Sequence, residues 1–282
     1  MTVGVQWHGQ AWRGAASKPG TPTPDPTTTY RVMSITKTMT AVLVLRAADE
    51  GRLRLDAPLP ALIGVDAPLP DGLTPRDLLR HRSGFVDYTL APGYQPDVPI
   101  TPEHAIELTL RAGLSAPPDT VTRYVNSNFL YLGLLVQQLE QRPFADLVTQ
   151  LVAPYGLHNT RVDPPGRPGW AGFSSGGVNS DVAEMAAWGA ALFAPGKVLS
   201  AADLALMTSI GEGRTGLGMW GMCPCGSSPT GFTAFGHPTA AGGLFYFPDI
   251  QMVVVMRADV STGDTTARAI SLGTVLRAAL VA

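Results

Sequence analysis

The 282-residue chain has few lysines, few cysteines and no long apolar run. No apolar stretch reaches the roughly 20 residues that a membrane-spanning helix needs, which argues against a membrane protein. The two cysteines, Cys223 and Cys225, are too close in sequence for an easy disulfide, and no second Cys or His pair lies nearby to complete a zinc site. We therefore interpret both as ordinary thiols and expect no metal and no cofactor.

Neither positive nor negative charge predominates in the chain. The net charge is −2 and the basic residues are scattered, which argues against a nucleic-acid partner and against a polybasic membrane contact. The N-terminal sequence MTVGVQWHGQ has neither the cationic segment nor the apolar segment of a signal peptide, so we expect a cytoplasmic protein. The oligomeric state is left open by these features.

The two ends of the chain carry strand patterns, and the middle carries helix patterns. Residues 3–8 and 10–15 alternate around Gly9, which predicts a hairpin, and apolar runs separated by turn residues follow from about residue 214. A helix is predicted to begin near Ser34 and to end before Gly51. Further helices are predicted at 74–81, 101–113, 128–141, 143–152, 180–196, 200–207 and 265–282.

This order predicts an α/β (α+β) fold, in which an antiparallel sheet with flanking helices is joined to an all-helical insertion. Residues 1–52 and 200–282 are expected to form the sheet subdomain, and residues 53–199 the helical one. With 45% hydrophobic and 15% charged residues, the chain can bury a core of that size. A cleft between two such lobes is a usual place for an active site.

The stretch MSITKTMT, residues 33–40, holds one of only three lysines among 20 basic residues. Lys18 and Lys197 lie in Pro- or Gly-rich segments and are expected to be solvated, whereas Lys37 lies within an apolar run. Ser34 precedes Lys37 by three residues and shares its helix face. A buried lysine has a lowered pKa and can accept a proton, which an arginine cannot. The spacing therefore suits a serine nucleophile activated by a lysine base.

Two later segments carry polar residues suited to the same chemistry. In YVNSN, Tyr124 and Asn126 lie two residues apart in a predicted loop, so their side chains point the same way. A tyrosine hydroxyl can relay a proton, and an amide can hold a substrate carbonyl. In FGHPTAAGG, His237 lies on a predicted strand among small residues, which suggests that another group approaches closely. Each pattern alone is also compatible with a structural role.

Taken in order, these patterns resemble the serine β-lactamase-like superfamily, in particular its class C β-lactamase, DD-peptidase and esterase branch. Three other segments agree with it: LLRHRSGF resembles a Leu-Leu-x-His-x-Ser-Gly segment, APYGLHNTRV a Pro-Leu-Gly-Met-x-x-Thr segment, and FSSGGVNSDVAEMAAWGAALF a Gly-Gly-hydrophobic-x-Ser-x-x-Asp helix start. The resemblance runs from about residue 3 to 280 and implies a β-lactamase/transpeptidase-like fold.

The resemblance also implies roles for the residues that match the family's motifs. Ser34 matches the acylated nucleophile and Lys37 the base on the same helix. Tyr124 matches the tyrosine that shuttles protons, and Asn126 the amide that orients the substrate. His237 matches the histidine of the His-x-Gly strand that replaces Lys-Thr-Gly in many esterase-like members.

Two positions of the late strand depart from the family's pattern. The family forms its oxyanion hole from two backbone N–H groups, and the matching residues are Ser34 and Ala240. Where relatives have glycine, this chain has Thr239, which we expect to contact the substrate. The preceding Pro238 lacks a backbone N–H, so we expect this strand at an edge of the sheet.

The sequence thus predicts a serine acyl-transfer enzyme that works through an acyl-enzyme on Ser34. The expected substrate is a small-molecule or peptide-like ester or amide, and the enzyme would be an esterase, an amidase or a biosynthetic transacylase. Two alternatives stay open: a catalytically silent ligand-binding or sensor module on the same fold, and a true β-lactamase or DD-peptidase. The expected cytoplasmic location favours the first prediction over a cell-wall enzyme.

Overall fold

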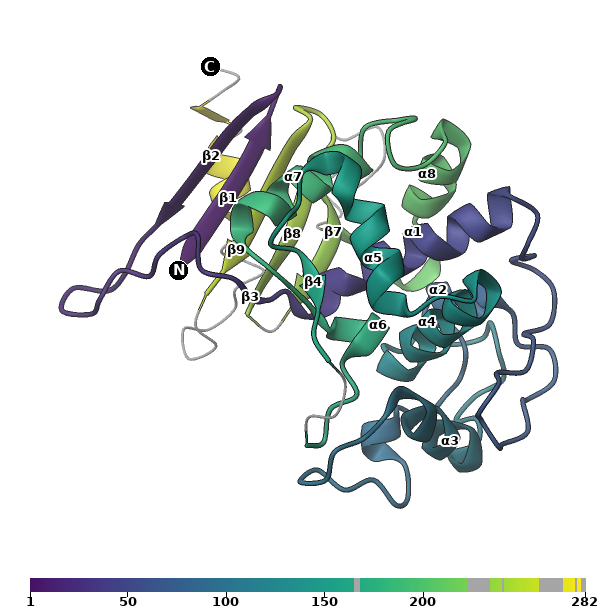
Figure 1. The fold of residues 1–282 in the computed structure, drawn as a ribbon. Helices are drawn as coiled ribbons and strands as arrows, with labels where there is room; N and C mark the ends of the chain where they lie inside the picture. Colours follow the sequence, from purple (N-terminus) through teal and green to yellow (C-terminus); the bar gives the residue numbers. More distant parts are fainter. Residues whose placement is uncertain (165–167, 223–233, 240, 259–270, 277, 280–282) are drawn as a thin grey trace.

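The computed structural model describes residues 1–164, 168–222, 234–239, 241–258, 271–276 and 278–279 (Figure 1). Cys223, Cys225, Ala240 and most of the helix predicted at 265–282 lie outside these residues, although residues 271–276 are helical. Within the described ranges, no helix is long and apolar enough to cross a membrane.

The main sheet is antiparallel and combines both ends of the chain, as the strand patterns predicted (Figure 1). Its predicted N-terminal hairpin is confirmed: His8 and Gly9, with φ values of 46° and 79°, form the two-residue turn that joins the first two strands. The strands lie in the order β2-β1-β9-β8-β7-β6. Their bounds are Thr2–Trp7 for β1, Gln10–Ala15 for β2, Trp220–Met222 for β6, Ala234–Thr239 for β7, Gly242–Phe247 for β8 and Met252–Arg257 for β9.

Both faces of this sheet are covered. On one face, α7 (Val182–Leu192) packs across β1, β8 and β9, and Gly189 permits the close approach because a Cβ there would lie 2.7 Å from Val253. On the other face, Leu272 and Leu276 pack against a separate apolar cluster. Its buried members are Val3, Met222, Phe245, Phe247, Met252, Val254 and Met256. The sheet is thus a layer between two apolar interfaces.

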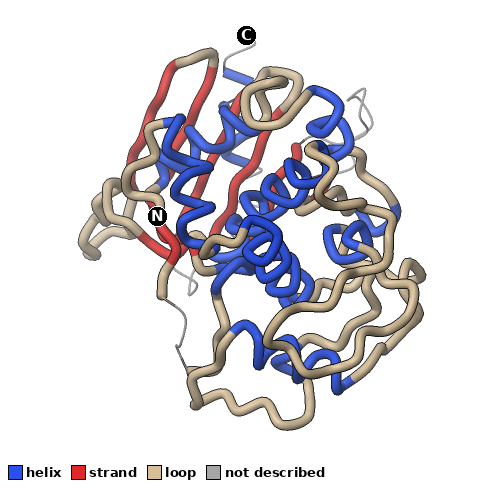
Figure 2. The backbone as a smooth tube through the Cα atoms, turned by 45° about the vertical axis from the view of Figure 1, so that its right-hand side comes forward, coloured by secondary structure: helices blue, strands red, loops and turns tan. Residues whose placement is uncertain are grey.

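The remaining helices form the second part of the molecule, and long loops surround them (Figure 2). Thr74, Thr101 and Ser200 cap α2, α3 and α8, as the Thr-Pro and Ser-x-x-Asp patterns predicted. Buried α1, which follows the short 3₁₀ turn η1, packs against α4 and α6. The bounds are Met33–Ile35 for η1, Thr36–Asp49 for α1, Pro75–Leu79 for α2, Pro102–Ala112 for α3, Asn126–Glu140 for α4, Phe144–Val152 for α5, Phe173–Gly176 for α6 and Ala201–Thr208 for α8.

The α+β class is confirmed, and the structure differs from expectation in two details. The insertion is not all-helical, because its strands β5 (Val178–Ser180) and β4 (Arg161–Val162) form a small second sheet with β3 (Tyr30–Arg31) from the N-terminal part. Strands of two or three residues are too short to show an alternating pattern. Helix α7 lies within residues 53–199 but packs on the main sheet. The subdomain boundaries themselves stay a prediction.

Candidate active site

The Ser34 hydroxyl lies between two potential proton carriers. Its Oγ is 2.5 Å from the hydroxyl of Tyr124 and 3.1 Å from Nζ of Lys37. The turn that presents it is tight, because the preceding residue, Met33, has a φ of 52°, a value that non-glycine residues rarely adopt. The Ser34 N–H belongs to the first turn, whose N–H groups have no acceptor within the helix. This turn therefore presents both a hydroxyl and an N–H group that its own helix leaves available.

Lys37 is fully buried beside that hydroxyl. Its Nζ donates to Ser34 Oγ at 3.1 Å, to Asn126 Oδ1 at 3.0 Å and to the carbonyl oxygen of Ser175 at 2.6 Å. Burial lowers the pKa of Lys37 to about 7, against an opposing effect of the Asp87 carboxylate. A neutral amine keeps two N–H groups for Asn126 and Ser175 and turns its lone pair toward Ser34. Lys37 is therefore placed to act as a base.

Threonines on α1 hold the Lys37 helix against the segment that carries Ser175. Thr36, Thr38 and Thr40 are buried, and each hydroxyl has a hydrogen-bond partner, as buried hydroxyls require. Thr36 Oγ1 accepts from the Val178 N–H at 3.2 Å, and Thr40 Oγ1 donates to the Ser174 carbonyl at 2.8 Å. These bonds fix the distance between Lys37 Nζ and its carbonyl acceptor.

Tyr124 and Asn126 reach the site from the start of α4. Sequence reasoning placed both in a loop, but Asn126 is the first residue of the helix, so that part of the prediction is wrong. Although Tyr124 exposes 39% of its surface, its hydroxyl faces Ser34, and burial raises its pKa to about 12 against the Ser34 hydrogen bond. At neutral pH the phenol therefore keeps its proton and can pass one on only as it receives another.

His81 is a buried residue of this site to which sequence reasoning assigned no role. Its Nδ1 accepts the Val125 N–H at 3.2 Å, its carbonyl accepts the Arg123 N–H at 2.9 Å, and its ring lies 4.6 Å from that of Tyr124. Burial and the nearby Lys37 lower the pKa of His81 well below its ordinary value. A neutral ring that accepts through Nδ1 carries its proton on Nε2. His81 therefore fixes the backbone on either side of Tyr124, at Arg123 and Val125.

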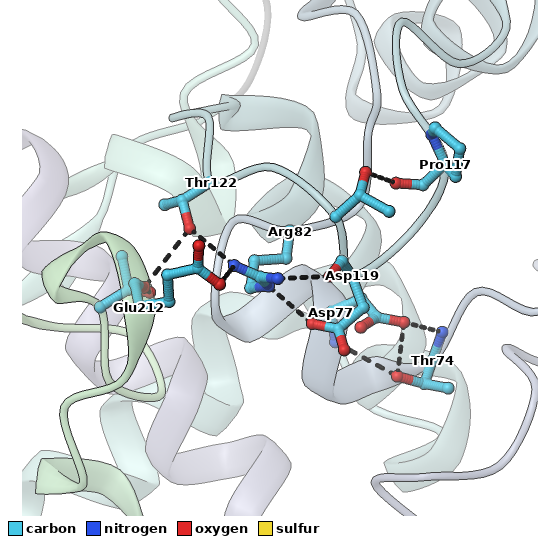
Figure 3. Close-up of polar contacts among 9 residues, drawn as sticks. Thr74, Asp77, Arg82, Pro117, Asp119, Thr122 and Glu212 are labelled. Atoms are coloured by element: carbon cyan, nitrogen blue, oxygen red, sulfur yellow. Dashed lines mark hydrogen bonds and ion pairs between the residues drawn. The ribbon is translucent and has the colours of Figure 1, made fainter.

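Arg82 fastens the loop that leads to Tyr124 (Figure 3). Its guanidinium bonds Asp119 at 2.6 Å, Glu212 at 3.2 Å and Thr122 Oγ1 at 3.3 Å, and its carbonyl accepts the Asp119 N–H at 2.8 Å. Asp119 and Glu212 expose 72% and 80% of their side chains, so each ion pair adds at most about 1 kcal/mol. Their main effect is on the position of the loop.

His237 lies beside Tyr124 but outside the polar contacts of Ser34. The two rings are 6.2 Å apart and edge to face. Its Nδ1 lies 3.0 Å from the Pro238 carbonyl, so Nδ1 bears the proton. Burial, with a smaller effect of Lys37, lowers the pKa of His237 to about 3. Within the described residues its Nε2 has no hydrogen-bond partner.

The strand that carries His237 is not an edge strand, which corrects the prediction made from Pro238. Strand β6 pairs with residues 234–236 of β7. That pairing does not extend to His237, Pro238 or Thr239, which pair with β8 on the other side. Pro238 is tolerated because no β6 partner requires its missing N–H. Thr239 Oγ1 accepts the Ala241 N–H at 3.3 Å. Ala240, the predicted second oxyanion residue, lies outside the described part of the chain.

Ser34 lines a cleft of about 420 Å³. Its walls combine apolar side chains with neutral polar ones, and among the described residues they are Met33, Ser34, Tyr124, Asn126, Trp170, Ser175, Gly176, Pro238 and Thr239. Trp170 packs over Gly176, where a Cβ would lie 3.0 Å from the ring, and Arg31 stacks on it at 4.1 Å. A larger hollow of about 690 Å³, near Trp7, contains none of these residues.

A second serine motif lies close by but is not a nucleophile elbow. Residues 172–176, GFSSG, match the Gly-x-Ser-x-Gly pattern of α/β-hydrolases. In those enzymes the central serine is exposed on a strand-to-helix turn. Here Ser174 lies in α6, is fully buried and donates to the Phe129 carbonyl at 2.7 Å.

Ser34 in η1 and Lys37 in α1 form a Ser-x-x-Lys motif beside an antiparallel sheet, and comparison with known proteins shows the class to which this arrangement belongs. The chain is a member of the beta-lactamase family, whose model matches residues 1–278. This places it in a superfamily of serine hydrolases, which confirms the resemblance inferred from the motifs.

Relatives and solved structures agree with this placement. The chain is 34% identical over 137 residues to penicillin-binding protein 4 of Amycolatopsis lactamdurans, a match that covers 46% of this chain and 35% of that protein. It spans about a third of the length of the curated relatives it matches. A D-stereospecific amidohydrolase from Streptomyces sp. shares the fold, with a TM-score of 0.73 and 23% identity over 92% of this chain and 89% of that one. A penicillin binding protein from Bacillus halodurans has a TM-score of 0.77 and 19% identity over 96% and 95% of the two chains.

Proposed function

We propose that this protein hydrolyses or transfers the acyl group of a small ester or amide through an acyl-enzyme on Ser34. The observation that carries the proposal is the position of Ser34 Oγ, within hydrogen-bond distance of both Lys37 Nζ and the Tyr124 hydroxyl. A serine becomes a useful nucleophile only when a neighbouring base takes its proton, and this pair supplies one base and one relay.

In the proposed reaction, neutral Lys37 takes the Ser34 proton as Oγ bonds to the carbonyl carbon of the substrate. The carbonyl π electrons move to its oxygen, and the Ser34 N–H is the donor available to that oxyanion. As the oxyanion collapses, the bond to the leaving alcohol or amine breaks, and the leaving group takes a proton from Tyr124, which regains one from Lys37. Water or another acceptor then cleaves the acyl-enzyme by the same steps in reverse, and Lys37 is neutral again.

The cleft supports an uncharged acyl donor of modest size. Met33, Trp170 and Pro238 offer apolar surface, and Asn126 and Thr239 offer neutral polar groups. None of the described residues that line the cleft is a cation, which a substrate carboxylate would need. The likeness to an amidohydrolase fits this choice, whereas the likeness to penicillin-binding proteins favours a carboxylate-bearing peptide or β-lactam as second candidate.

The test is the intact mass of the protein after exposure to esters, thioesters, amides and β-lactams in parallel. We expect one acyl adduct and measurable turnover with p-nitrophenyl acetate or butyrate, and weak or no hydrolysis of penicillins and cephalosporins. Efficient cephalosporin hydrolysis would instead support the β-lactamase alternative. Added alcohols or amines that capture the acyl group would distinguish transfer from hydrolysis.

Thr239→Gly is expected to widen the range of acyl groups, because Thr239 lines the cleft where relatives were expected to have glycine. The ratio of kcat/KM for p-nitrophenyl octanoate to that for the acetate should rise by about tenfold, the lower end of what one methylene contact is worth. Thr239→Ser, which keeps the hydroxyl that accepts from Ala241 and removes a methyl group, is the matched control and should change the ratio less. An unchanged ratio in the glycine variant would place the acyl chain elsewhere.

A silent binding module on this fold is the other candidate, and Pro238 and Thr239 are the residues that favour it. It requires that no member of the panel acylates Ser34, although ligands still bind in the cleft.

The cytoplasmic location expected from the N-terminal sequence stays a prediction.

A further inference from the structure

Asp87 is a buried carboxylate that bonds the start of α4 from outside that helix. Its Oδ2 accepts the Asn126 N–H at 2.5 Å, and its Oδ1 accepts from the N–H of Thr89 at 3.1 Å and from its hydroxyl at 2.8 Å. Helix α4 has no capping side chain of its own, because the residue before it is Val125. A negative group at a helix N-terminus is favourable, so Asp87 serves as the missing cap.

The residue that Asp87 holds is also a partner of the proposed base. Asn126 offers its N–H to Asp87, while its side-chain Oδ1 accepts from Lys37 Nζ at 3.0 Å. A continuous chain of hydrogen bonds therefore runs from the Asp87 carboxylate through Asn126 and Lys37 to Ser34 Oγ. The neighbouring Tyr88 N–H bonds Ser127 Oγ at 3.1 Å, which fixes the next residue of the helix in the same way.

We propose that Asp87 is a positioning residue for Asn126 and Lys37, and that its negative charge favours the protonated form of the Lys37 amine. The titratable groups that face Lys37 are Asp87 and His81 from the connection after α2, Tyr124 from the start of α4, and His237 from β7. The two histidines and the phenol are uncharged near neutral pH, as their shifted pKa values require. Asp87 is thus the group that opposes the effect of burial on Lys37.

Removal of the Asp87 charge is expected to lower the pKa of Lys37. Burial lowers the pKa of Lys37 and Asp87 raises it, so removing the Asp87 charge lowers that pKa further. Lys37 would then lose its proton at a lower pH. A purely structural Asp87 would leave this midpoint where it is.

The three lysines of the chain make a direct measurement possible. We expect the ¹³Cε NMR spectrum of lysine-labelled protein to show one signal that disappears in Lys37→Arg, and its pH titration reports Lys37 whether or not the protein is active. In Asp87→Asn the midpoint should fall by about one pH unit, since an opposite charge nearby is worth one to three. Asp97→Asn, which removes an exposed carboxylate from the same connection, should leave it unchanged. An unchanged or raised midpoint in Asp87→Asn would overturn the proposal.

The kinetic consequence rests on the proposed function and is measured separately. The acid limb of kcat/KM for p-nitrophenyl acetate should shift to lower pH in Asp87→Asn by the same amount as the NMR midpoint. Asp87→Glu keeps the charge and displaces the cap, so it is expected to retain the wild-type midpoint and to lose plateau activity. It also serves if the asparagine variant does not fold, because a glutamate midpoint about one pH unit below that of the wild type would contradict the charge effect. If the wild type is inactive but the NMR midpoint of Lys37 still falls in Asp87→Asn, the proposed function is refuted and the effect of Asp87 on Lys37 stands.

Discussion

Ser34→Ala is expected to abolish covalent labelling by a fluorophosphonate and to lower ester turnover by at least about 10⁴-fold, as loss of the nucleophile does in serine hydrolases. The reason is geometric. In the described part of the chain, Ser34 is the serine whose hydroxyl bonds both a buried amine and a phenol. The measurement is peptide mapping of the labelled protein, together with kcat/KM for p-nitrophenyl butyrate.

Two other serines near the site could compete with Ser34 for the label, so the mapping experiment can contradict the assignment. Ser175 also lines the cleft, and Ser174 lies in a Gly-x-Ser-x-Gly sequence, so each is a competing position for the label. Ser209→Ala, at an exposed position after α8, is the matched control and should label like the wild type. A label mapped to Ser174 or Ser175, or an equal yield from Ser34→Ala, would show that another residue is the nucleophile.

The sheet could be predicted from the sequence because its strands carry local signals. Alternation, glycine turns and the apolar runs after residue 214 identified the strands, and capping residues identified α2, α3 and α8. The small sheet of β3, β4 and β5 and the four-residue α6 could not be found in this way. Such short segments are stabilised by contacts with distant parts of the chain, which no local pattern records.

Within the site, too, contacts between residues close in sequence could be predicted, whereas contacts between distant residues could not be predicted from local patterns. Ser34 and Lys37 are neighbours on one turn, so their spacing predicted a contact that the structure contains. Tyr124 was placed by resemblance, and it lies at Ser34. His237 was also placed by resemblance; it lies beside Tyr124 without a polar contact to Ser34 or Lys37 among the described residues, and its role stays a prediction.

The start of α4 shows why the supporting residues were missed. A helix start is recognised by a capping side chain just before it, and Val125 gives no such signal. The cap is supplied by Asp87, which lies 39 residues earlier in the chain. The residue was visible in the sequence, but the contact is a product of the fold. His81 is a similar case: the segment LLRHRSGF that contains it supports the family resemblance, but its contact with the Val125 N–H is a product of the fold.

Lys37→Arg is expected to lower acylation of Ser34 by about 10²–10⁴-fold while the protein still folds. Arginine keeps the positive charge and the hydrogen-bond donors, but it does not give up its proton at any accessible pH. In the wild type, kcat/KM should rise with pH through the region near 7, since burial lowers the pKa of Lys37 to about 7 and only the neutral amine is a base. The variant should lack this rise. The measurement is the pH profile of kcat/KM for p-nitrophenyl acetate.

Two comparisons separate a lost base from a damaged structure. Lys197→Arg changes an exposed lysine and should leave the pH profile unchanged. Far-ultraviolet circular dichroism and the Tm report whether the Lys37 variant is folded. Near-native turnover of folded Lys37→Arg would mean that Lys37 acts as a buried cation that orients Asn126 and Ser175. Ser34 would then need another base, and the candidate beside Tyr124 is His237, whose Nε2 has no hydrogen-bond partner within the described residues. His237→Gln would in that case remove the remaining activity, whereas the mechanism through Lys37 predicts a smaller effect.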